Sequence, residues 1–286
     1  MIIVTDELGY TGIGEAAPLP GMSIDVLDDA VSAAADLAAR VPLLIESPAH
    51  ATGVADRVTA APAARFAIET ALLTALAQRA HTSVAALWNA IPQGELRSAI
   101  VVDDEVQARA AVAAGARCLK IKVGADDLDR VKRISAAAPA ARLRVDANRS
   151  WPRDGVAELM AQLADLPIDY VEEPCEGAHE LLGHPGVCRI ALDESLVHLG
   201  RADLARALES PQLAALVLKP TLLGGFARCF ELASAAHRHG VAPVVSHTLE
   251  GPIGYAACIE LGRAIGADVP VGLAPHGALD QFAAAL

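Results

Sequence analysis

From Ser98 onward, short runs of Val, Ile and Leu alternate with Ala-rich stretches of helical periodicity. Apolar runs separated by amphipathic helices are typical of a parallel sheet that is buried on both faces. Eight such strands close most naturally into a barrel with seven helices between them. An open doubly wound sheet is the alternative, but no Gly-x-Gly-x-x-Gly segment follows a strand. The predicted strands are 98–102, 118–123, 143–146, 170–172, 189–192, 215–219, 242–246 and 271–274. The clearest predicted helices are 127–138, 153–166, 225–239 and 253–265.

The first part of the chain has a different pattern. Residues 1–15 alternate on either side of a turn and predict a β-hairpin. Residues 25–39 and 62–79 have the spacing of amphipathic helices. We therefore expect a small α+β domain over residues 1–93 and an α/β domain, a (β/α)7β TIM-like barrel, over residues 94–286. The last residues of the barrel domain are expected to return to the first domain.

Composition narrows the function classes. Hydrophobic residues make up 53% of the 286 residues, enough for a sizeable core. The formal net charge of −12 argues against binding to nucleic acid or to an anionic membrane, so a local positive site must attract any anionic substrate. The five cysteines show no metal-ligand spacing and fit reduced thiols. With no membrane-spanning run and no signal peptide, we expect a soluble, cytoplasmic protein.

Two lysines share one face of the second predicted strand. Side chains alternate along a strand, so Lys120 and Lys122 point to one face, while Leu119 and Ile121 point to the other. Two ammonium groups on one face repel each other and lose hydration on burial, unless anions or a metal–carboxylate site lie opposite. Taken alone, the pair is better explained as a solvated surface strand. The choice therefore depends on the other strand ends.

Carboxylates follow at the ends of the next three predicted strands: Asp146, Glu172 and Asp193. Catalytic groups of such barrels lie at the carboxyl ends of the strands, so we expect these three side chains to converge. Converging carboxylates repel one another unless a dication neutralises them. Oxygen-only ligation suits Mg²⁺, or Mn²⁺, rather than Zn²⁺. The three residues are the predicted metal ligands.

Lysines flank the acidic strand ends, with Lys120 and Lys122 before them and Lys219 at the end of the sixth strand. A neighbouring ammonium and a dication both lower the pKa of a lysine, which makes a lysine general base feasible. The metal is expected to bind a substrate carboxylate and to stabilise the enediolate that forms when the α-proton leaves. The predicted partner is therefore a small anionic carboxylate substrate.

The set of strand ends resembles the enolase superfamily, in its muconate-lactonising-enzyme subgroup. The matching segments are Lys120-Ile-Lys122, Asp146-Ala-Asn148, Glu172-Glu-Pro174, Asp193-Glu-Ser195 and Lys219-Pro220. Gly12-Ile-Gly-Glu-Ala-Ala-Pro18 is similar to the capping-domain segment of the superfamily, so the resemblance covers nearly the whole chain. It implies that residues 1–93 form a capping domain. As a set, the motifs are specific for the superfamily and much less so for the reaction.

Within the subgroup, the chain is most similar to the o-succinylbenzoate synthases of menaquinone biosynthesis. The segments that carry this likeness are Ala147-Asn-Arg-Ser-Trp151, Glu172-Glu-Pro-Cys175 and Asp193-Glu-Ser-Leu196. The resemblance implies a carbon–oxygen lyase in which Lys122 removes the α-proton and then protonates the leaving hydroxyl, a syn dehydration. Lys219 is expected to stabilise the enediolate, and Lys120 to assist at the carboxylate.

Other functions stay open on the sequence. Racemases and epimerases of N-acylamino acids or dipeptides, and cycloisomerases, share the lysine pair, although the Asp-x-Asp signature of many dipeptide epimerases is absent near the eighth strand. A catalytically silent scaffold is a further alternative, because a fold does not imply a function. A scaffold has no physical reason to retain mutually repelling charges.

Further polar residues lie near the predicted site. Asn148 is expected to face it, and Ser246 and His247, at the end of the seventh strand, are candidate substrate contacts. His247 could equally cap the following helix, and His276 is a weaker candidate. By strand alternation, the two remaining glutamates point away from the site, in supporting positions; they are Glu173 and Glu194.

The N-terminus departs from the pattern of the subgroup. The resemblance implies a strand and a mobile loop before the stretch that matches residues 2–5, so we expect an N-terminally short capping domain with an incomplete lid. A two-stranded hairpin is marginal alone and presents a free edge. We therefore expect the capping helices or a partner subunit to stabilise the hairpin, and a homo-oligomer is one possibility.

Overall fold

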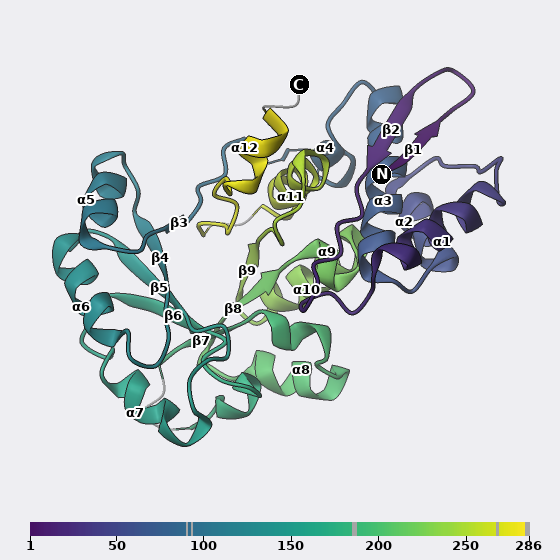
Figure 1. Ribbon diagram of the computed structural model, residues 1–286. Helices are drawn as coiled ribbons and strands as arrows, with labels where there is room; N and C mark the ends of the chain where they lie inside the picture. Colours follow the sequence, from purple (N-terminus) through teal and green to yellow (C-terminus); the bar gives the residue numbers. More distant parts are fainter. Residues whose placement is uncertain (90, 93, 185–187, 267–268, 284–286) are drawn as a thin grey trace.

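A curled sheet of seven parallel strands, in the order β3-β4-β5-β6-β7-β8-β9, forms the centre of the larger domain (Figure 1). This computed structural model describes residues 1–89, 91–92, 94–184, 188–266 and 269–283. Val271 is bridged to Ser98 and Gly272 to Ser246, so this short segment joins the two edges of the sheet. The predicted fold class, an α/β barrel of the (β/α)7β TIM-like type, is confirmed, with an eighth strand shorter than expected. The sheet strands are β3 (Ile100–Val101), β4 (Cys118–Lys122), β5 (Arg142–Asp146), β6 (Ile168–Glu172), β7 (Ile190–Leu192), β8 (Leu213–Leu218) and β9 (Ala242–Val245).

Helices cover the outside of the sheet. They are α5 (Glu105–Ala113), α6 (Leu128–Ala137), α7 (Val156–Ala161), α8 (Arg201–Glu209), α9 (Pro220–Leu223), α10 (Phe226–Arg238) and α11 (Pro252–Ile265). The connection from β6 to β7 differs from the prediction, because its described part holds only a 3₁₀ turn over Ala178–Leu181. Gly177 and Gly183, with φ of 69° and 96°, break the helical pattern there. Helix α7 is shorter than the predicted 153–166, because residues 153–155 form a 3₁₀ turn and the α-helix ends at Ala161.

The capping domain contains a hairpin, β1 (Ile2–Thr5) and β2 (Thr11–Gly14), and the helices α1 (Leu27–Ala38), α2 (Pro48–Val58), α3 (Pro62–Arg79) and α4 (Val84–Trp88). Strand β2 lies directly on α3. A Cβ atom added at Gly12 would be 1.8 Å from the carbonyl oxygen of Ala71, and one at Gly14 would be 1.8 Å from that of Ala67. Only glycine allows this approach of backbone to backbone. The expectation that the capping helices stabilise the hairpin is confirmed.

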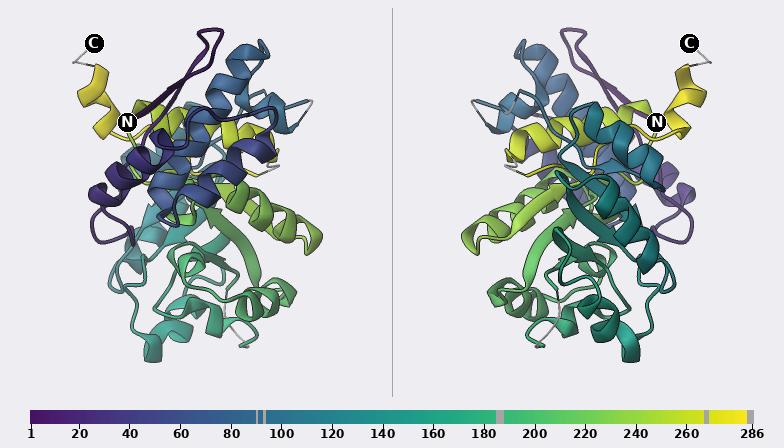
Figure 2. Two further views of the ribbon diagram at one scale, coloured as in Figure 1. Left: turned by 90° about the vertical axis from the view of Figure 1, so that its right-hand side faces the viewer. Right: turned by 90° about the vertical axis from the view of Figure 1, so that its left-hand side faces the viewer.

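The capping domain contacts the barrel at the carboxyl ends of the strands. Helix α3 lies against α9, which begins directly after β8, and the capping helices, beside the barrel in Figure 1, lie in front of it in the left view of Figure 2. Helix α4 packs on the barrel helices, with the rings of Trp88 and Phe230 stacked at 4.4 Å. The boundary at residue 93 stays a prediction. The expected return of the last residues falls partly on residues 284–286, outside the described part; the last described helix is α12 (Ala278–Ala283).

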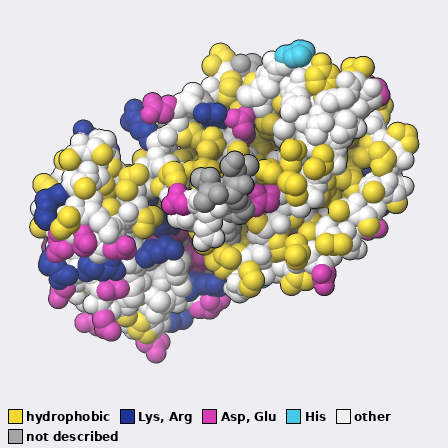
Figure 3. Space-filling model, turned by 45° about the horizontal axis from the view of Figure 1, so that its top comes forward, with side chains coloured by type: hydrophobic (Ala, Val, Ile, Leu, Met, Phe, Trp, Pro, Cys, Tyr) yellow, Lys and Arg dark blue, Asp and Glu magenta, His cyan; other side chains and the backbone are white. Residues whose placement is uncertain are grey.

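The two domains differ on the surface. Charged side chains gather on the barrel side, whereas much of the capping side is uncharged and apolar (Figure 3). Helix α1 exposes apolar side chains next to one another on one face, with Leu27 62% and Val31 63% exposed. Patches of this kind often mark contact surfaces between proteins, and a homo-oligomer stays a prediction. Within the described residues, no helix combines the length and apolarity needed to cross a membrane.

Candidate active site

A cavity of about 620 Å³ lies where the strand ends face the capping domain. Most of the predicted site residues line it: Lys120, Lys122, Asp146, Asn148, Glu194, Lys219, Ser246 and His247. Glu172 and Asp193 are not among the lining residues; they are buried next to Lys120 and Lys219, which are. Apolar side chains of the capping domain, Leu19 and Met22, complete the wall. The structure therefore brings the predicted lysines and carboxylates together at one end of the barrel.

Lys120 is held between two of the predicted metal ligands. Its Nζ atom lies 2.9 Å from Asp146 Oδ2 and 2.9 Å from each carboxylate oxygen of Glu172. Burial alone would lower the pKa of Lys120, but the carboxylates of Glu172 and Asp146 outweigh it and hold the pKa well above its ordinary value. For Glu172, burial is likewise outweighed by Lys120 and Lys219, and its pKa is lowered. Lys120 is thus a fixed cation.

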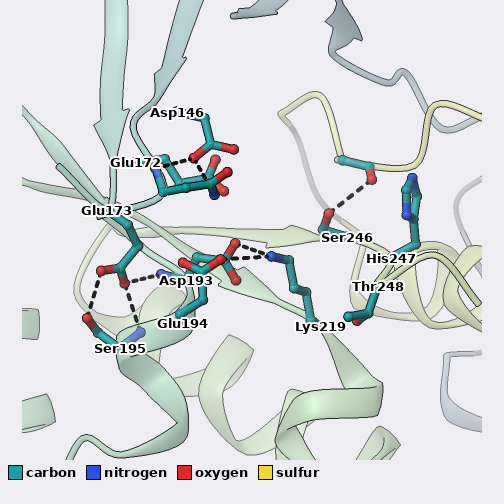
Figure 4. A network of polar contacts seen from close by, with 12 residues as sticks. Asp146, Glu172, Glu173, Asp193, Glu194, Ser195, Lys219, Ser246, His247 and Thr248 are labelled. Atoms are coloured by element: carbon teal, nitrogen blue, oxygen red, sulfur yellow. Dashed lines mark hydrogen bonds and ion pairs between the residues drawn. The ribbon is translucent and has the colours of Figure 1, made fainter. Parts of the chain in front are cut away.

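Lys219 has the same role on the other side. Its ammonium pairs with Asp193 and lies 3.5 Å from Glu194 Oε1 (Figure 4). Burial would lower the pKa of Lys219, yet the carboxylates of Asp193 and Glu194 raise it. Burial also raises the pKa of Asp193 well above its ordinary value, against the opposing effect of Lys219. The expectation that Glu194 points away from the site is wrong: β7 ends at Leu192, so strand alternation no longer applies two residues later.

Lys122 stands apart from the other two lysines. Its side chain is exposed and lines the cavity, and within the described part of the chain it forms no ion pair. Leu119 and Ile121, on the opposite face of β4, are fully buried, as the strand alternation predicts. Among the described residues that line the cavity, Lys122 is therefore a lysine without an ion pair to a carboxylate.

Unusual backbone conformations place several polar groups. Asn148 has a φ of 43°, and both its backbone N–H and its side-chain amide donate to Asp146 Oδ1, at 3.1 and 3.0 Å. Arg149, with a φ of 62°, also lines the cavity, and the sequence reasoning missed it. Left-handed conformations of non-glycine residues are uncommon and concentrate at functional sites. The Asp-Ala-Asn-Arg segment at the end of β5 was the available signal.

Glu173 accepts hydrogen bonds from the segment that contains Asp193, in agreement with its predicted supporting position. Its Oε1 accepts hydrogen bonds from the backbone N–H of Asp193 at 2.8 Å and of Ser195 at 2.9 Å. The hydroxyl of Ser195 donates to Oε2 at 2.8 Å. Because all three donors belong to one short segment, Glu173 holds the backbone that carries the Asp193 carboxylate.

The polar side chains at the end of the seventh strand form hydrogen bonds with nearby backbone groups of the barrel. His247 Nδ1 accepts from the N–H of Leu249 at 3.3 Å, so Nε2 carries the proton and donates to the carbonyl of Ala274 at 3.1 Å. Burial lowers the pKa of His247, in keeping with a neutral ring. The hydroxyl of Ser246 donates to the carbonyl of Gly272 at 3.1 Å. Both residues join the seventh and eighth strands, and their rôle as substrate contacts stays a prediction. His276 also lines the cavity.

Residues 103–278 match the family described as Enolase C-terminal domain-like, which is more than half of the chain. The chain belongs to the enolase superfamily. It is 32% identical to the o-succinylbenzoate synthase of Pectobacterium atrosepticum, over 96% of this chain and 81% of that protein. It is 31% identical to the o-succinylbenzoate synthase of Edwardsiella ictaluri, with the same coverage. Among solved structures, the dipeptide epimerase of Methylococcus capsulatus complexed with Mg and L-Arg-D-Lys is 26% identical, with a TM-score of 0.79 over 95% of this chain and 81% of that one.

The donors at the strand ends of this superfamily member fit a hard dication in their chemistry. Carboxylate oxygens are the ligands Mg²⁺ takes, and one of them, Glu194 Oε2, is buried without a hydrogen-bond partner among the described residues. No three described His, Cys, Asp or Glu side chains are arranged to hold a metal ion in this conformation. The ammonium groups of Lys120 and Lys219 contact the carboxylates instead.

Proposed function

We propose that this chain is a magnesium-dependent dehydratase of the o-succinylbenzoate synthase type, a carbon–oxygen lyase that acts on a small carboxylate substrate. The observation that carries the proposal is that the three lysines at the strand ends differ in their ion pairing. Carboxylates hold Lys120 and Lys219 as cations, while Lys122 faces the cavity without an ion pair among the described residues. The two synthases that share 31 and 32% of their residues with this chain support the reaction type.

Each lysine has a distinct part in the proposed reaction. Lys122 takes the proton α to the substrate carboxylate and returns it to the leaving hydroxyl on the same face, which gives a syn elimination. Lys219 stays protonated beside Asp193 and offsets the negative charge that develops on the substrate. Lys120 holds Asp146 and Glu172 in place and adds positive charge at the carboxylate.

The proposed Mg²⁺ would be held by Asp146, Glu172 and Asp193 and would supply positive charge to the substrate carboxylate. Asn148 donates to Asp146 Oδ1, and Glu173 accepts from the backbone N–H of Asp193, so both contacts support segments that carry proposed ligands. Supporting groups of this kind commonly set the direction of metal ligands.

Epimerisation is the second candidate, because the dipeptide epimerase of M. capsulatus shares the fold. A racemase or epimerase of this type needs a second base opposite Lys122. Lys219 is the candidate for that base, and in this structure its contacts with Asp193 and Glu194 raise its pKa. Because Asp193 is itself a proposed Mg²⁺ ligand, the preference for dehydration rests on the two synthases of 31 and 32% identity.

The test is to incubate the purified protein and Mg²⁺ with the hydroxycyclohexadiene carboxylate precursor of o-succinylbenzoate, and in parallel with N-succinylamino acids and dipeptides in D₂O. We expect dehydration of the precursor. Deuterium exchange into a dipeptide, without dehydration of the precursor, would refute the lyase proposal and favour an epimerase.

Lys122→Ala should abolish turnover and leave the unfolding transition unchanged, because its exposed side chain contributes chemistry rather than packing. Lys132→Ala is the matched control, since Lys132 is an exposed lysine of α6 whose ion pair among the described residues is with the exposed Asp129. Turnover by Lys122→Ala at more than a few per cent of the wild-type rate would remove Lys122 from the base position.

A further inference from the structure

The loop after β2 brings the capping domain to the cavity. We call residues 16–23 the cap loop; it has no regular secondary structure, and Leu19 and Met22 in it line the cavity. Its middle is closed on itself, because the N–H of Leu19 donates to Ser23 Oγ and the N–H of Ser23 to the carbonyl of Leu19, both at 2.8 Å. The position of the cap loop over the cavity therefore depends on the anchors at its two ends.

The first anchor, Glu15, reaches the barrel. Its carboxylate accepts hydrogen bonds from the N–H of Gly251 at 2.6 Å and of Gly254 at 2.9 Å, at the start of α11. A carboxylate at this end of a helix satisfies amides that lack partners within the helix and interacts favourably with the helix dipole. The contact requires glycine, since a Cβ atom at Gly251 would be 2.5 Å from Glu15 Oε1.

The second anchor stays within the capping domain. Asp25 Oδ2 accepts a hydrogen bond from the N–H of Ala63 at 2.8 Å, at the start of α3. Of these two anchors, Glu15 is thus the one that ties the cap loop to the barrel. Helix α11 also follows directly on the segment 246–249, which lines the cavity from the barrel side. The Glu15 carboxylate joins the two walls.

We infer that Glu15 is a positioning residue that fixes the cap-loop wall of the substrate cavity against the barrel. The inference rests on the proposed function in one respect, namely that the cavity holds the substrate. Leu19 and Met22 line the cavity with apolar side chains that cannot donate or accept a proton, so in this inference they contact a non-reacting part of the substrate. Contacts made equally in the ground state and the transition state affect KM rather than kcat.

A second hydrogen-bonded contact between the capping domain and the barrel provides a matched control. Glu69 on α3 accepts a hydrogen bond from the N–H of Phe226 at 2.5 Å, at the start of α10. It resembles Glu15 in residue type and in its place at a helix start. Neither Glu69 nor its neighbours in sequence line the cavity. A substitution here changes the contact between the domains without touching the cap loop.

The experiment compares Glu15→Gln, Gly251→Ala and Glu69→Gln by steady-state kinetics and by hydrogen exchange of the cap-loop amides. Glu15→Gln replaces one acceptor oxygen by an amide that faces an N–H group. Gly251→Ala displaces the same carboxylate from the barrel side, at a φ of −69° that alanine adopts freely. For both we expect a roughly tenfold increase in KM, the effect of losing one hydrogen bond to a charged group, with kcat unchanged within about twofold. Their cap-loop amides should exchange faster, and the double variant should be no worse than either single one.

Glu69→Gln should leave KM and cap-loop exchange as in the wild type. An equal rise in KM in Glu69→Gln, or unchanged cap-loop exchange in Glu15→Gln, would overturn the inference and reduce Glu15 to a general domain contact. Exchange needs no substrate, so it decides the inference even if the wild-type protein lacks dehydratase activity, a result that would count against the proposed function alone.

Discussion

Glu69 gives the protein a pH-dependent stability that can be worked out from its surroundings. The side chain is fully buried between α3 and α10. Its Oε2 accepts from the N–H of Phe226 at 2.5 Å and of Ala227 at 3.4 Å, but its Oε1 has no hydrogen-bond partner among the described residues. Burial therefore outweighs the two amides and the nearby Arg65, and it raises the pKa of Glu69 from 4.5 to about 8.

The direction in which stability changes with pH depends on whether the folded or the unfolded state keeps the proton on Glu69. Between pH 4.5 and about 8, the folded state keeps the proton on Glu69 and the unfolded state has lost it. The stability associated with this proton is fully present below pH 4.5 and is lost as the pH rises to about 8. The difference between 4.5 and about 8 is 3.5 pH units, and at about 1.4 kcal/mol per unit it corresponds to roughly 5 kcal/mol. Glutamine at this position stays neutral and does not titrate.

Urea unfolding of the wild type and of Glu69→Gln, at several pH values from about 5 to 8, tests this reasoning. We expect the free energy of unfolding of Glu69→Gln to increase relative to that of the wild type by up to about 1.4 kcal/mol for each pH unit, with the slope falling as the pH approaches about 8. Glu231→Gln is the control, because Glu231 lies on the same helix α10 but is 59% exposed, and its difference from the wild type should be flat in pH. A flat difference for Glu69→Gln would show that Glu69 is ionised in the folded protein and would refute the argument.

Two further outcomes follow from close contacts and charge. Gly14→Ala should lower the free energy of unfolding by about 1–3 kcal/mol or more in thermal melts, because the new Cβ would lie 1.8 Å from the carbonyl oxygen of Ala67. Gly53→Ala is its control and should be neutral or stabilising by up to about 1 kcal/mol, since its nearest neighbour is a mobile arginine end at 3.4 Å. In calorimetry, Mg²⁺ should bind the wild type and Asp129→Asn but not Asp193→Asn, and no binding to the wild type would favour the scaffold alternative.

The strand ends could be predicted because two simple rules determine them. Alternation puts Lys120 and Lys122 on one face of β4, and adjacent parallel strands bring their carboxyl ends together. The pairing of Lys122 with Asp146, and of Asp146 with Glu172, follows that expectation. The rules do not say which lysine is ion-paired. Lys120 lies deeper in the sheet and reaches both carboxylates, while Lys122, directly opposite Asp146 in register, ends in the open cavity.

Contacts that depend on distant parts of the chain lay beyond the sequence rules. The hydrogen bond from Gly251 to Glu15 spans 236 residues, and that from Phe226 to Glu69 spans 157 residues. Strand or helix periodicity within a short window cannot predict contacts over such distances in the sequence. Helix α2 was also missed, although Ser47 caps its start and Pro48 is its first residue, a recognised start signal. Glu194 was misplaced because alternation was extended past the end of β7. The error at Glu194 begins where regular secondary structure ends.

The charges at the strand ends explain why the site is built in this way. Four carboxylates meet there, Asp146, Glu172, Asp193 and Glu194, and two lysines of the described residues contact them, so with all four ionised the negative charges exceed the contacting cations by two. Burial raises the pKa of Asp146 and of Asp193, because an ionised carboxylate loses hydration inside the folded protein. A dication would offset the remaining charge and compete with the protons on these carboxylates, so its affinity should fall as the pH is lowered. Such an arrangement is unfavourable for folding alone, and the proposed metal-dependent chemistry supplies the reason to keep it.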